Sequence, residues 1–496
     1  MTAMNRRHFL SAGAALTAGA LAAPAMAVPL NAPAKWDAEY DIVIVGAGGA
    51  GLAGACEAVQ RGLKVAVLEK EPIVGGSSTI CGGQWAVGGS AEQEKRGIKD
   101  SEDQFVKDML TTGKNENDPD LVRAFVQESK RMYEWVTKEL GVKPFTVTLT
   151  AGMSVPRAHT FNPSEIIQAL RKYSESKGAK ILLNTKAERL LWDPNKQEIA
   201  GVQIVRKGKK VNIRAAKGVL LAAGGFSRNP KMLKKYAPLL EKAGVIAGLG
   251  TQGDGILMAQ AYGADMIDTP YVKASYGFSL TASTIQDMSL IYYKGAIMVN
   301  NTGKRFVDES ISYKVLADIA FAQPEGKSWL VFDDSIRQRA MKEDPKQDGI
   351  MWKSIDSGKV PDFVFQGKTI EEAAQKAGLD PKAVADTVKR YNGFVDAGKD
   401  DEFGRKGLSS GYGKLVKIEK GPFYVFPSVG AMIGTYCGLR IKPDGQVLDV
   451  FGEPIKRLFA AGEMTGGVHG AAYMTGTAFG KALSFGRLAA RAIAKS

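Results

Sequence analysis

Residues 42–51 read Ile-Val-Ile-Val-Gly-Ala-Gly-Gly-Ala-Gly and contain the most informative pattern in this chain of 496 residues. Ile42–Val45 is an unbroken apolar run, which is typical of a strand buried on both faces of a parallel sheet. It leads directly into closely spaced glycines, and a helical pattern then continues to Gln60. A second apolar run, Val65–Leu68, ends at Glu69. The order of strand, glycine-rich turn, helix, strand and acidic residue predicts a dinucleotide-binding unit.

Each glycine of this turn has its own physical reason. Gly46 permits the tight turn, and Gly48 with Gly49 lets backbone approach a pyrophosphate at the positive end of the helix. Gly51 allows the helix to pack closely on the strand. Glu69 can accept hydrogen bonds from the ribose hydroxyls of an adenosine. A glycine-rich loop without a ligand would leave Glu69 unexplained, so we expect these five residues to bind a dinucleotide.

The later sequence favours FAD over NAD. Small residues follow the second strand, and a late strand ends at Gly462-Glu463, ahead of a glycine-rich stretch and a helix from about Gly476. Glu463 can hold ribityl hydroxyls, and the helix start can face the flavin. A second fingerprint for a nicotinamide domain is not apparent. Further residues expected to bind FAD are Lys70, Gly75, Gly76, Ser77, Ser78, Gly82, Gly83, Ala223, Gly224, Asp254, Gly462, Glu463, Gly476 and Ala478.

The first 27 residues have the features of an export signal. Arg6-Arg7 precedes an apolar, alanine-rich run and the small-x-small site Ala25–Ala27, which is typical of a twin-arginine signal peptide. The run is too short and too rich in Ala and Gly for a stable membrane span. We therefore expect a periplasmic protein without a membrane span after cleavage. The alternative is a disordered tail.

Charge and composition exclude several functions. The formal net charge is +14, and +12 without the two arginines of the leader, with the basic residues dispersed. This pattern fits a surface that attracts an acidic protein or an anionic substrate, and no nucleic-acid motif is present. The three cysteines and three histidines form no metal-ligand or haem-attachment pattern, so no metal is predicted.

Five motifs together carry a family resemblance from about Asp41 to the C-terminus. They are Gly46–Gly51, Val219–Phe226, Gly253–Gly255, Gly303–Glu309 and Ala461–His469. The chain resembles the fumarate reductase/succinate dehydrogenase flavoprotein family. Its nearest form is similar to the soluble periplasmic fumarate reductases, and urocanate reductase and 3-ketosteroid dehydrogenase are relatives.

The resemblance implies an α/β fold in two domains. A Rossmann-like FAD-binding domain would be discontinuous, formed by residues 38–270 and 434–496. An inserted α+β capping domain would occupy residues 271–433, with hinges near Thr269-Pro270 and 421–428. The substrate would lie between cap and flavin.

The resemblance also bears on the cofactor and the electron partner. Some relatives attach FAD covalently through a histidine, but this chain has none between His8 and His159, so we expect non-covalent FAD. Some relatives fuse a haem domain to the same chain. Here the fingerprint follows the leader almost at once, which implies a separate c-type cytochrome or quinol-linked electron donor.

The positions that carry fumarate chemistry in the family differ here. The proton-donating Arg matches Tyr313, and the two residues of its relay match Ser289 and Tyr292. The carboxylate-binding residues match three positions, namely Ser275, Gly434 and Tyr473. Because all six have changed, we do not expect fumarate as the substrate. A phenol can donate a proton or a hydrogen bond to a carbonyl oxygen and offers an apolar face, so an enone or a bulky enoate, with or without an aromatic group, fits better.

We therefore expect Tyr313, Tyr473 and Tyr292 to be catalytic, with Tyr313 and Tyr473 preferred because strong motifs lie beside them. Expected substrate contacts are Ser275, Tyr276, His159, Gly434 and Tyr436. Two alternatives stay open, in which single tyrosines pack in the core and His159 makes a structural hydrogen bond. Three lysines that could pair with one carboxylate, or lie on the surface by default, are Lys273, Lys294 and Lys314.

The predicted function is a reductase of a polarised C=C bond that serves anaerobic respiration. One alternative is a dehydrogenase, similar to the 3-ketosteroid dehydrogenases, that introduces such a bond. The second alternative is a flavin electron carrier without catalytic activity.

Overall fold

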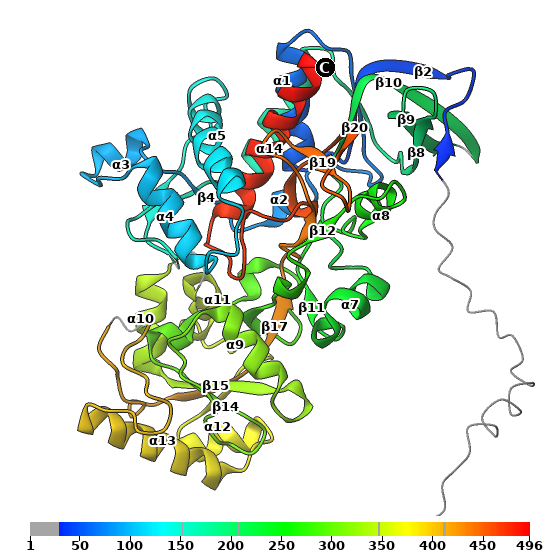
Figure 1. Ribbon diagram of the computed structural model, residues 1–496. Coiled ribbons are helices and arrows are strands. Elements are labelled where there is room, and N and C mark those ends of the chain that lie inside the picture. The colour runs from blue at the N-terminus through cyan, green and yellow to red at the C-terminus, as the bar shows by residue number, and fades with distance from the viewer. Residues whose placement is uncertain (1–28, 151, 207, 346–347, 410–412) are drawn as a thin grey trace, which may run out of the picture.

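The computed structural model describes residues 29–150, 152–206, 208–345, 348–409 and 413–496 (Figure 1). The predicted leader, residues 1–27, lies outside the described residues. Two sheets with their covering helices make up most of the molecule, and Figure 1 shows one above the other.

The first sheet is built on the strands that the fingerprint predicts. Its order is β1-β8-β9-β10-β2-β3-β7, with β20 on β10 and β19 on β20. The strands β2, β3 and β7 are parallel to one another, and β10 continues the parallel run beside β2. The bounds are β1 Leu30–Asn31, β2 Ala38–Val45, β3 Val65–Leu68, β7 Lys180–Leu182, β8 Ala187–Asp193, β9 Glu198–Arg206, β10 Lys209–Leu221, β19 Gln446–Leu448 and β20 Pro454–Ala460. The expected α/β fold with a parallel sheet is confirmed.

The C-terminal segment returns to this sheet. β20 pairs in parallel with the end of β10, where Val219 lies opposite Leu458. The last helix, α14 (Thr477–Lys495), packs on α1 (Gly49–Gln60), as Figure 1 shows. The contact requires glycine, because a Cβ on Gly486 would lie 2.1 Å from the Ala50 carbonyl oxygen. The C-terminal segment and the strand β2 therefore belong to the same sheet.

A buried charge cluster joins these two helices to α5 (Pro119–Lys138). The Arg491 guanidinium lies 2.9 Å from a Glu128 carboxylate oxygen and 3.0 Å from one of Glu57. Glu57 and Glu128 are 3% and 0% exposed. Arg491 pairs with both carboxylates, and burial of these carboxylates without a positively charged partner would be costly.

The second sheet lies in the middle of the sequence. Its order is β11-β17-β15-β14, and β13 and β16 also pair with β17. The bounds are β11 Gly244–Val245, β13 Ser275–Ser279, β14 Ile297–Val299, β15 Ser328–Asp333, β16 Phe365–Gly367 and β17 Phe423–Met432. Its helices are α9 Tyr313–Phe321, α10 Asp334–Glu343, α11 Asp348–Asp356, α12 Ile370–Lys376 and α13 Pro381–Ala397. We refer to this unit as the cap; its short strand β11 comes from before the expected boundary at Tyr271.

Helices between β3 and β10 cover the nucleotide-binding end of the first sheet. They include α2 Gly76–Ile80, α4 Glu102–Thr112, α5 and α6 Pro163–Ser176. On α5 the apolar residues Leu121, Val122, Phe125 and Val126 are buried at helical spacing, and the Asp118 carboxylate caps its first turn. Within the described residues, every helix is too short or too polar to cross a membrane.

Candidate active site

The fingerprint glycines form a cradle at the start of α1. Gly46 has φ +104°, and a Cβ there would lie 2.4 Å from the Ala222 carbonyl oxygen, so only glycine fits. No side chain caps α1 at its N-cap, Gly48. A Cβ on Gly48 would meet nothing nearer than the Gly75 carbonyl oxygen at 3.7 Å. The Gly49 N–H donates to the Ser78 hydroxyl at 3.2 Å. A helix start with open space beside Gly48 suits a pyrophosphate.

Glu69 stands at the carboxyl end of β3, as predicted. Its carboxylate accepts hydrogen bonds from the backbone N–H of Ala47 at 2.7 Å and of Glu71 at 2.9 Å. These bonds tie the fingerprint loop to the next strand. In folds of this type the adenosine ribose lies at this point.

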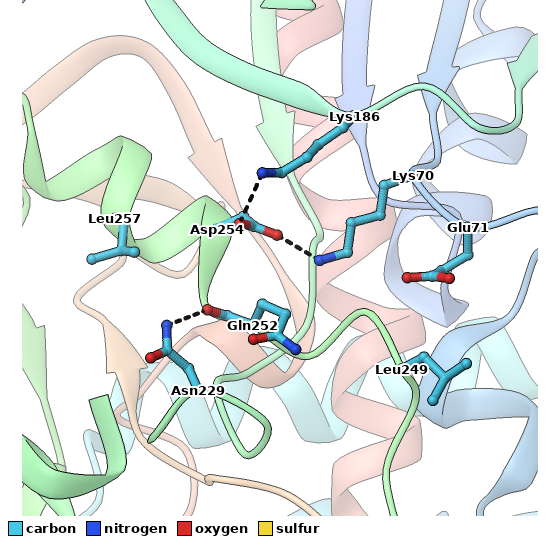
Figure 2. A pocket seen from close by; sticks show the side chains of 8 residues that line it. All are labelled: Lys70, Glu71, Lys186, Asn229, Leu249, Gln252, Asp254 and Leu257. Atoms are coloured by element: carbon cyan, nitrogen blue, oxygen red, sulfur yellow. Dashed lines mark hydrogen bonds and ion pairs between the residues drawn. The ribbon is translucent and has the colours of Figure 1, made fainter. Parts of the chain in front are cut away.

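A pocket of about 480 Å³ opens beside Glu69 (Figure 2). Two of the expected FAD ligands line it, and the Lys70 ammonium lies 2.5 Å from an Asp254 carboxylate oxygen. Lys186 approaches the same aspartate at 3.8 Å. Polar side chains from four segments converge here, which suits the adenosine half of a dinucleotide. Lys186 was not among the predicted residues, since nothing in its local sequence marks it.

The opposite end of the cradle surrounds Glu463. Its carboxylate accepts a hydrogen bond from the Thr435 backbone N–H at 3.0 Å, and burial raises its pKa. A Cβ on Gly225 would lie 2.3 Å from a Glu463 oxygen. Helix α14 begins just after Gly476, which has φ +84° and no side-chain cap. An acid that can form hydrogen bonds with hydroxyl groups and a nearby helix start are groups that fit the ribityl chain and polar flavin edge of FAD.

Three tyrosines gather where the cap meets the start of α14. This tyrosine cluster consists of Tyr313 at the start of α9, Tyr436 after β17, and Tyr473 before α14. The Tyr436 and Tyr473 ring centroids are 4.8 Å apart, and the Tyr473 hydroxyl accepts a hydrogen bond from the Gly476 N–H at 2.9 Å. All three rings are half-buried. Burial raises their pKa values, so the phenols stay protonated at neutral pH and can act as donors.

Lys314 lies against the tyrosine cluster, and the sequence had indicated it only as one of three lysines that could pair with a carboxylate. The surface position assumed for it by default is wrong, because the residue is only 4% exposed. Its ammonium donates to the Ser275 hydroxyl at 2.7 Å and the Tyr436 hydroxyl at 3.0 Å. Burial lowers the Lys314 pKa to about 7, against the opposing effect of Asp318. The helical spacing of Lys314 with the buried Ala317 was the available signal.

The other two lysines differ from Lys314. Lys273 forms an ion pair with Asp318, and Lys294 lies 2.9 Å from Glu343. Both are partly exposed, so each already has a carboxylate partner near the surface.

Tyr276 and Tyr292 do not reach the space beside the tyrosine cluster. Both are 0% exposed and belong to the apolar core of the cap. The Tyr292 hydroxyl donates to the Tyr276 carbonyl oxygen at 3.2 Å, and the Tyr276 hydroxyl bonds to that of Ser328 at 2.8 Å. This geometry corrects the expectation that Tyr292 is catalytic and that Tyr276 contacts substrate. Hydroxyls held in this way favour the packing alternative.

His159 also has a structural position. Its Nε2 lies 2.6 Å from the Ser90 hydroxyl and its Nδ1 lies 2.8 Å from the Arg157 carbonyl oxygen. The ring is fully buried and stacks edge-on to Tyr133. Because both ring nitrogens are occupied, the expected substrate contact is replaced by the structural alternative. Gly434, by contrast, lies beside the Glu463 carboxylate.

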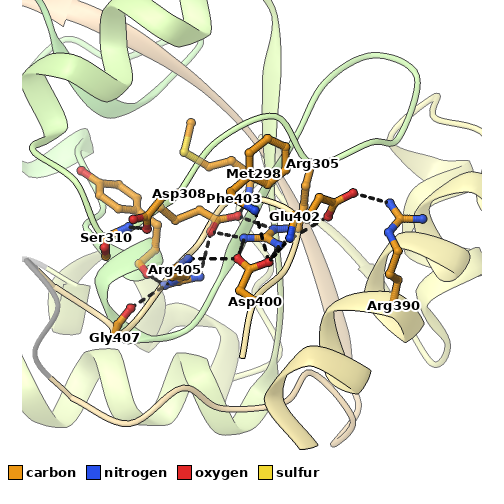
Figure 3. A network of polar contacts seen from close by, with 12 residues as sticks. Met298, Arg305, Asp308, Ser310, Arg390, Asp400, Glu402, Phe403, Arg405 and Gly407 are labelled. Atoms are coloured by element: carbon orange, nitrogen blue, oxygen red, sulfur yellow. Dashed lines mark hydrogen bonds and ion pairs between the residues drawn. The ribbon is translucent and has the colours of Figure 1, made fainter. Parts of the chain in front are cut away.

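The motif Gly303–Glu309 forms the polar core of the cap (Figure 3). Arg305 makes paired contacts with Glu309 and Asp400, each about 3 Å away. Arg405 contacts Glu309 at 3.1 Å and donates to the Tyr292 carbonyl oxygen at 2.7 Å. This network fixes the chain that leads into α9, so the motif positions Tyr313 and Lys314 and does not touch the site itself. In the part of the chain that the structure describes, no group of acidic, Cys and His residues could hold a metal ion.

Comparison with known proteins identifies the family. A model described as "FAD binding domain" matches residues 41–478. The urocanate reductase of Eggerthella lenta is 33% identical over 481 residues, which cover 93% of this chain and 76% of that protein. The NADH:fumarate oxidoreductase of Klebsiella pneumoniae is 32% identical over 461 residues, but these are 92% of this chain and only 48% of the relative. This chain therefore spans about half of that protein.

Solved structures agree. The open conformation of a flavocytochrome c3 fumarate reductase is matched with TM-score 0.80 and 29% identity, over 93% of this chain and 79% of that one. The 3-ketosteroid-Δ4-(5α)-dehydrogenase of Rhodococcus jostii RHA1 is matched with TM-score 0.74 and 25% identity, over 95% and 100%. The chain belongs to the fumarate reductase/succinate dehydrogenase flavoprotein family, whose members are FAD-dependent oxidoreductases that act on carbon–carbon bonds.

Proposed function

We propose that this protein is a periplasmic FAD-dependent reductase of a polarised carbon–carbon double bond, in an enoate or enone other than fumarate. The tyrosine cluster carries the proposal. It supplies protonated phenols at the junction of cap and FAD domain, where fumarate-type chemistry would call for arginine and histidine. Relatives that are named as reductases of fumarate and urocanate support the reaction type.

The residues of the site can divide the work. Bound FAD would supply hydride chemistry. The phenol of Tyr436, held by Lys314 at 3.0 Å, can donate to the substrate oxygen on which negative charge grows. Tyr313 or Tyr473 can donate the proton to carbon. Because burial raises their pKa values, each phenol keeps its proton as a hydrogen-bond donor until the reacting substrate becomes the stronger base. Closure of the cap would exclude water.

We further propose that FAD is held without a covalent bond. The segment Gly75–Gly83 contains no histidine, and its one thiol belongs to Cys81. Burial raises the pKa of that thiol to about 11, and it donates to the Ser78 carbonyl oxygen at 3.2 Å. A protonated, hydrogen-bonded thiol is a poor nucleophile for attachment to the flavin.

We also propose export by the twin-arginine route and a separate c-type cytochrome or quinol-linked electron donor. The Arg6-Arg7 leader supports the first statement. The net charge of +12 without the leader would attract an acidic partner, and one matched structure is that of a flavocytochrome.

The decisive assay measures oxidation of reduced methyl viologen by FAD-loaded protein against a panel of fumarate, enoates and enones. We expect turnover with an enoate or enone and little with fumarate. Rapid reduction of fumarate would overturn the interpretation of the tyrosine cluster. Bound FAD without turnover on the whole panel would favour the electron carrier.

A dehydrogenase is the second candidate, because the matched ketosteroid dehydrogenase aligns over its full length. The same phenols would then accept a proton. Reduction of an artificial electron acceptor by saturated ketones, in the absence of viologen-linked reduction, would favour this direction.

A further inference from the structure

Lys314 is a buried cation without an anion. Both of its hydrogen-bond partners, the hydroxyls of Ser275 and Tyr436, are neutral. No Asp or Glu in the described residues lies within ion-pair distance of its ammonium, and the residues outside the description include neither amino acid. Asp318, one turn along α9, is already paired with Lys273. A buried ammonium is costly unless an anion accompanies it.

The surroundings of Lys314 restrict what this anion can be. The ammonium lies 4.4 Å from the centroid of the Tyr436 ring, 5.6 Å from that of Tyr473 and 5.5 Å from that of Tyr313. Two of its three N–H donors are used within the protein. The third N–H can donate a hydrogen bond to one oxygen of a carboxylate. The half-buried tyrosine rings provide apolar faces for the rest of the ligand.

The positive charge in the site can balance only one acidic group of a ligand. His469 is buried among these rings, and burial lowers its pKa well below the usual value, so it is neutral. Lys481, the other buried lysine at the start of α14, donates to the Thr465 carbonyl oxygen and faces Asp268 and Glu463. These two acidic neighbours raise the pKa of Lys481 against the effect of burial, so its charge is partly offset within the protein. A second carboxylate on the ligand would have no partner.

We propose that Lys314 is the anchor for the single carboxylate of the substrate, and that the substrate is a monoanionic enoate with a planar, aromatic or similarly apolar group. This inference rests on the proposed function and selects the enoate over the enone. Lys314 thereby sets substrate specificity, while the phenols keep the role of proton donors. Substrates with two carboxylates and neutral enones would both be disfavoured.

The test compares acids with their neutral counterparts by binding, without turnover. FAD-loaded protein is titrated with benzoate, 3-phenylpropanoate and 3-phenylpropenoate, and with the methyl ester of each, and binding is followed by the flavin difference spectrum. At least one acid should bind tighter than its ester. In Lys314→Gln, the binding of the acid should weaken by roughly 10- to 100-fold, which is the range for one buried charged hydrogen bond. The binding of the ester should change little. Lys314→Arg should retain part of the preference.

The matched control is Lys294→Gln, which removes a partly exposed lysine of the cap that is paired with Glu343. It should leave the preference for acids unchanged. FAD content and the melting temperature of each variant report whether it folds. If no acid binds better than its ester, or if the preference survives in Lys314→Gln, the proposal is wrong. An equal loss of affinity for acid and ester in Lys314→Gln would also overturn the proposal. Lys314 would then act as a hydrogen-bond donor to both ligands and would not select the charged one.

A second measurement needs no variant. The Lys314 pKa of about 7 means that part of the free protein carries a neutral Lys314 at pH 7, so binding of a carboxylate should be accompanied by uptake of a fraction of a proton. The other titratable groups that face Lys314 are Asp318, His469 and the tyrosine cluster; burial lowers the pKa of His469 and raises the pKa values of the three tyrosines, away from the neutral range. Calorimetry in buffers of different ionisation enthalpy measures this uptake. Binding of an acid without proton uptake would contradict the inference, whereas failure of viologen-linked turnover would contradict only the proposed function.

Discussion

Substitution of Lys314 by methionine should alter how stability depends on pH. Methionine keeps the apolar stem and removes the charge. In the native protein the Lys314 pKa is about 7, against an ordinary value of 10.5. Between these values the unfolded chain binds a proton that the folded protein does not, so the stability of the native protein rises with pH. Each pH unit in this window contributes about 1.4 kcal/mol, or about 2–3 kcal/mol between pH 7 and pH 9.

The assay is urea unfolding of substrate-free, FAD-loaded protein at both pH values. All other titrating groups are shared by the native protein and Lys314→Met, so the difference between their unfolding free energies isolates Lys314. We expect Lys314→Met to lose about 2–3 kcal/mol relative to the native protein as pH rises from 7 to 9. Lys294→Met should show no such change, because Lys294 is partly exposed and paired with Glu343. A difference that does not vary with pH would refute the reasoning that Lys314 is a buried, uncompensated cation.

Three further predictions concern separate parts of the molecule. Tyr313→Phe should retain FAD, by absorbance, yet lose about 10²- to 10⁴-fold in viologen-linked turnover if it is the proton donor; full activity would remove Tyr313 from the mechanism. Gly46→Val should yield protein without FAD, since its Cβ would lie 2.4 Å from the Ala222 carbonyl oxygen at φ +104°; a yellow variant would contradict the cradle. Glu128→Leu should cost about 1–3 kcal/mol in urea unfolding, because Arg491 loses two charged hydrogen bonds to Glu128 but keeps its ion pair with Glu57, and a cost near zero would mean that the cluster is solvated.

Much of the FAD domain could be predicted from local pattern. The run Ile42–Val45, the turn at Gly46 and the acid Glu69 follow from short-range rules, because strand burial, positive φ and an uncapped helix start are properties of adjacent residues. The structure has β3 at Val65–Leu68 and α1 from Gly49 to Gln60, as these rules require. Such features depend on local backbone geometry, so they can be predicted from short stretches of the sequence.

The lining of the active site depended on tertiary structure. The motifs located six candidate positions, but they did not separate Tyr313, which is partly exposed, from Tyr292, whose hydroxyl bonds within the core. Lys314 belongs to the site because Tyr436, 122 positions away in the chain and just after β17, lies beside it in the folded protein. Burial, and therefore charge state, is determined by segments that meet in space. The helical spacing of Lys314 and Ala317 can indicate a buried face, but it does not show which distant segment covers that face.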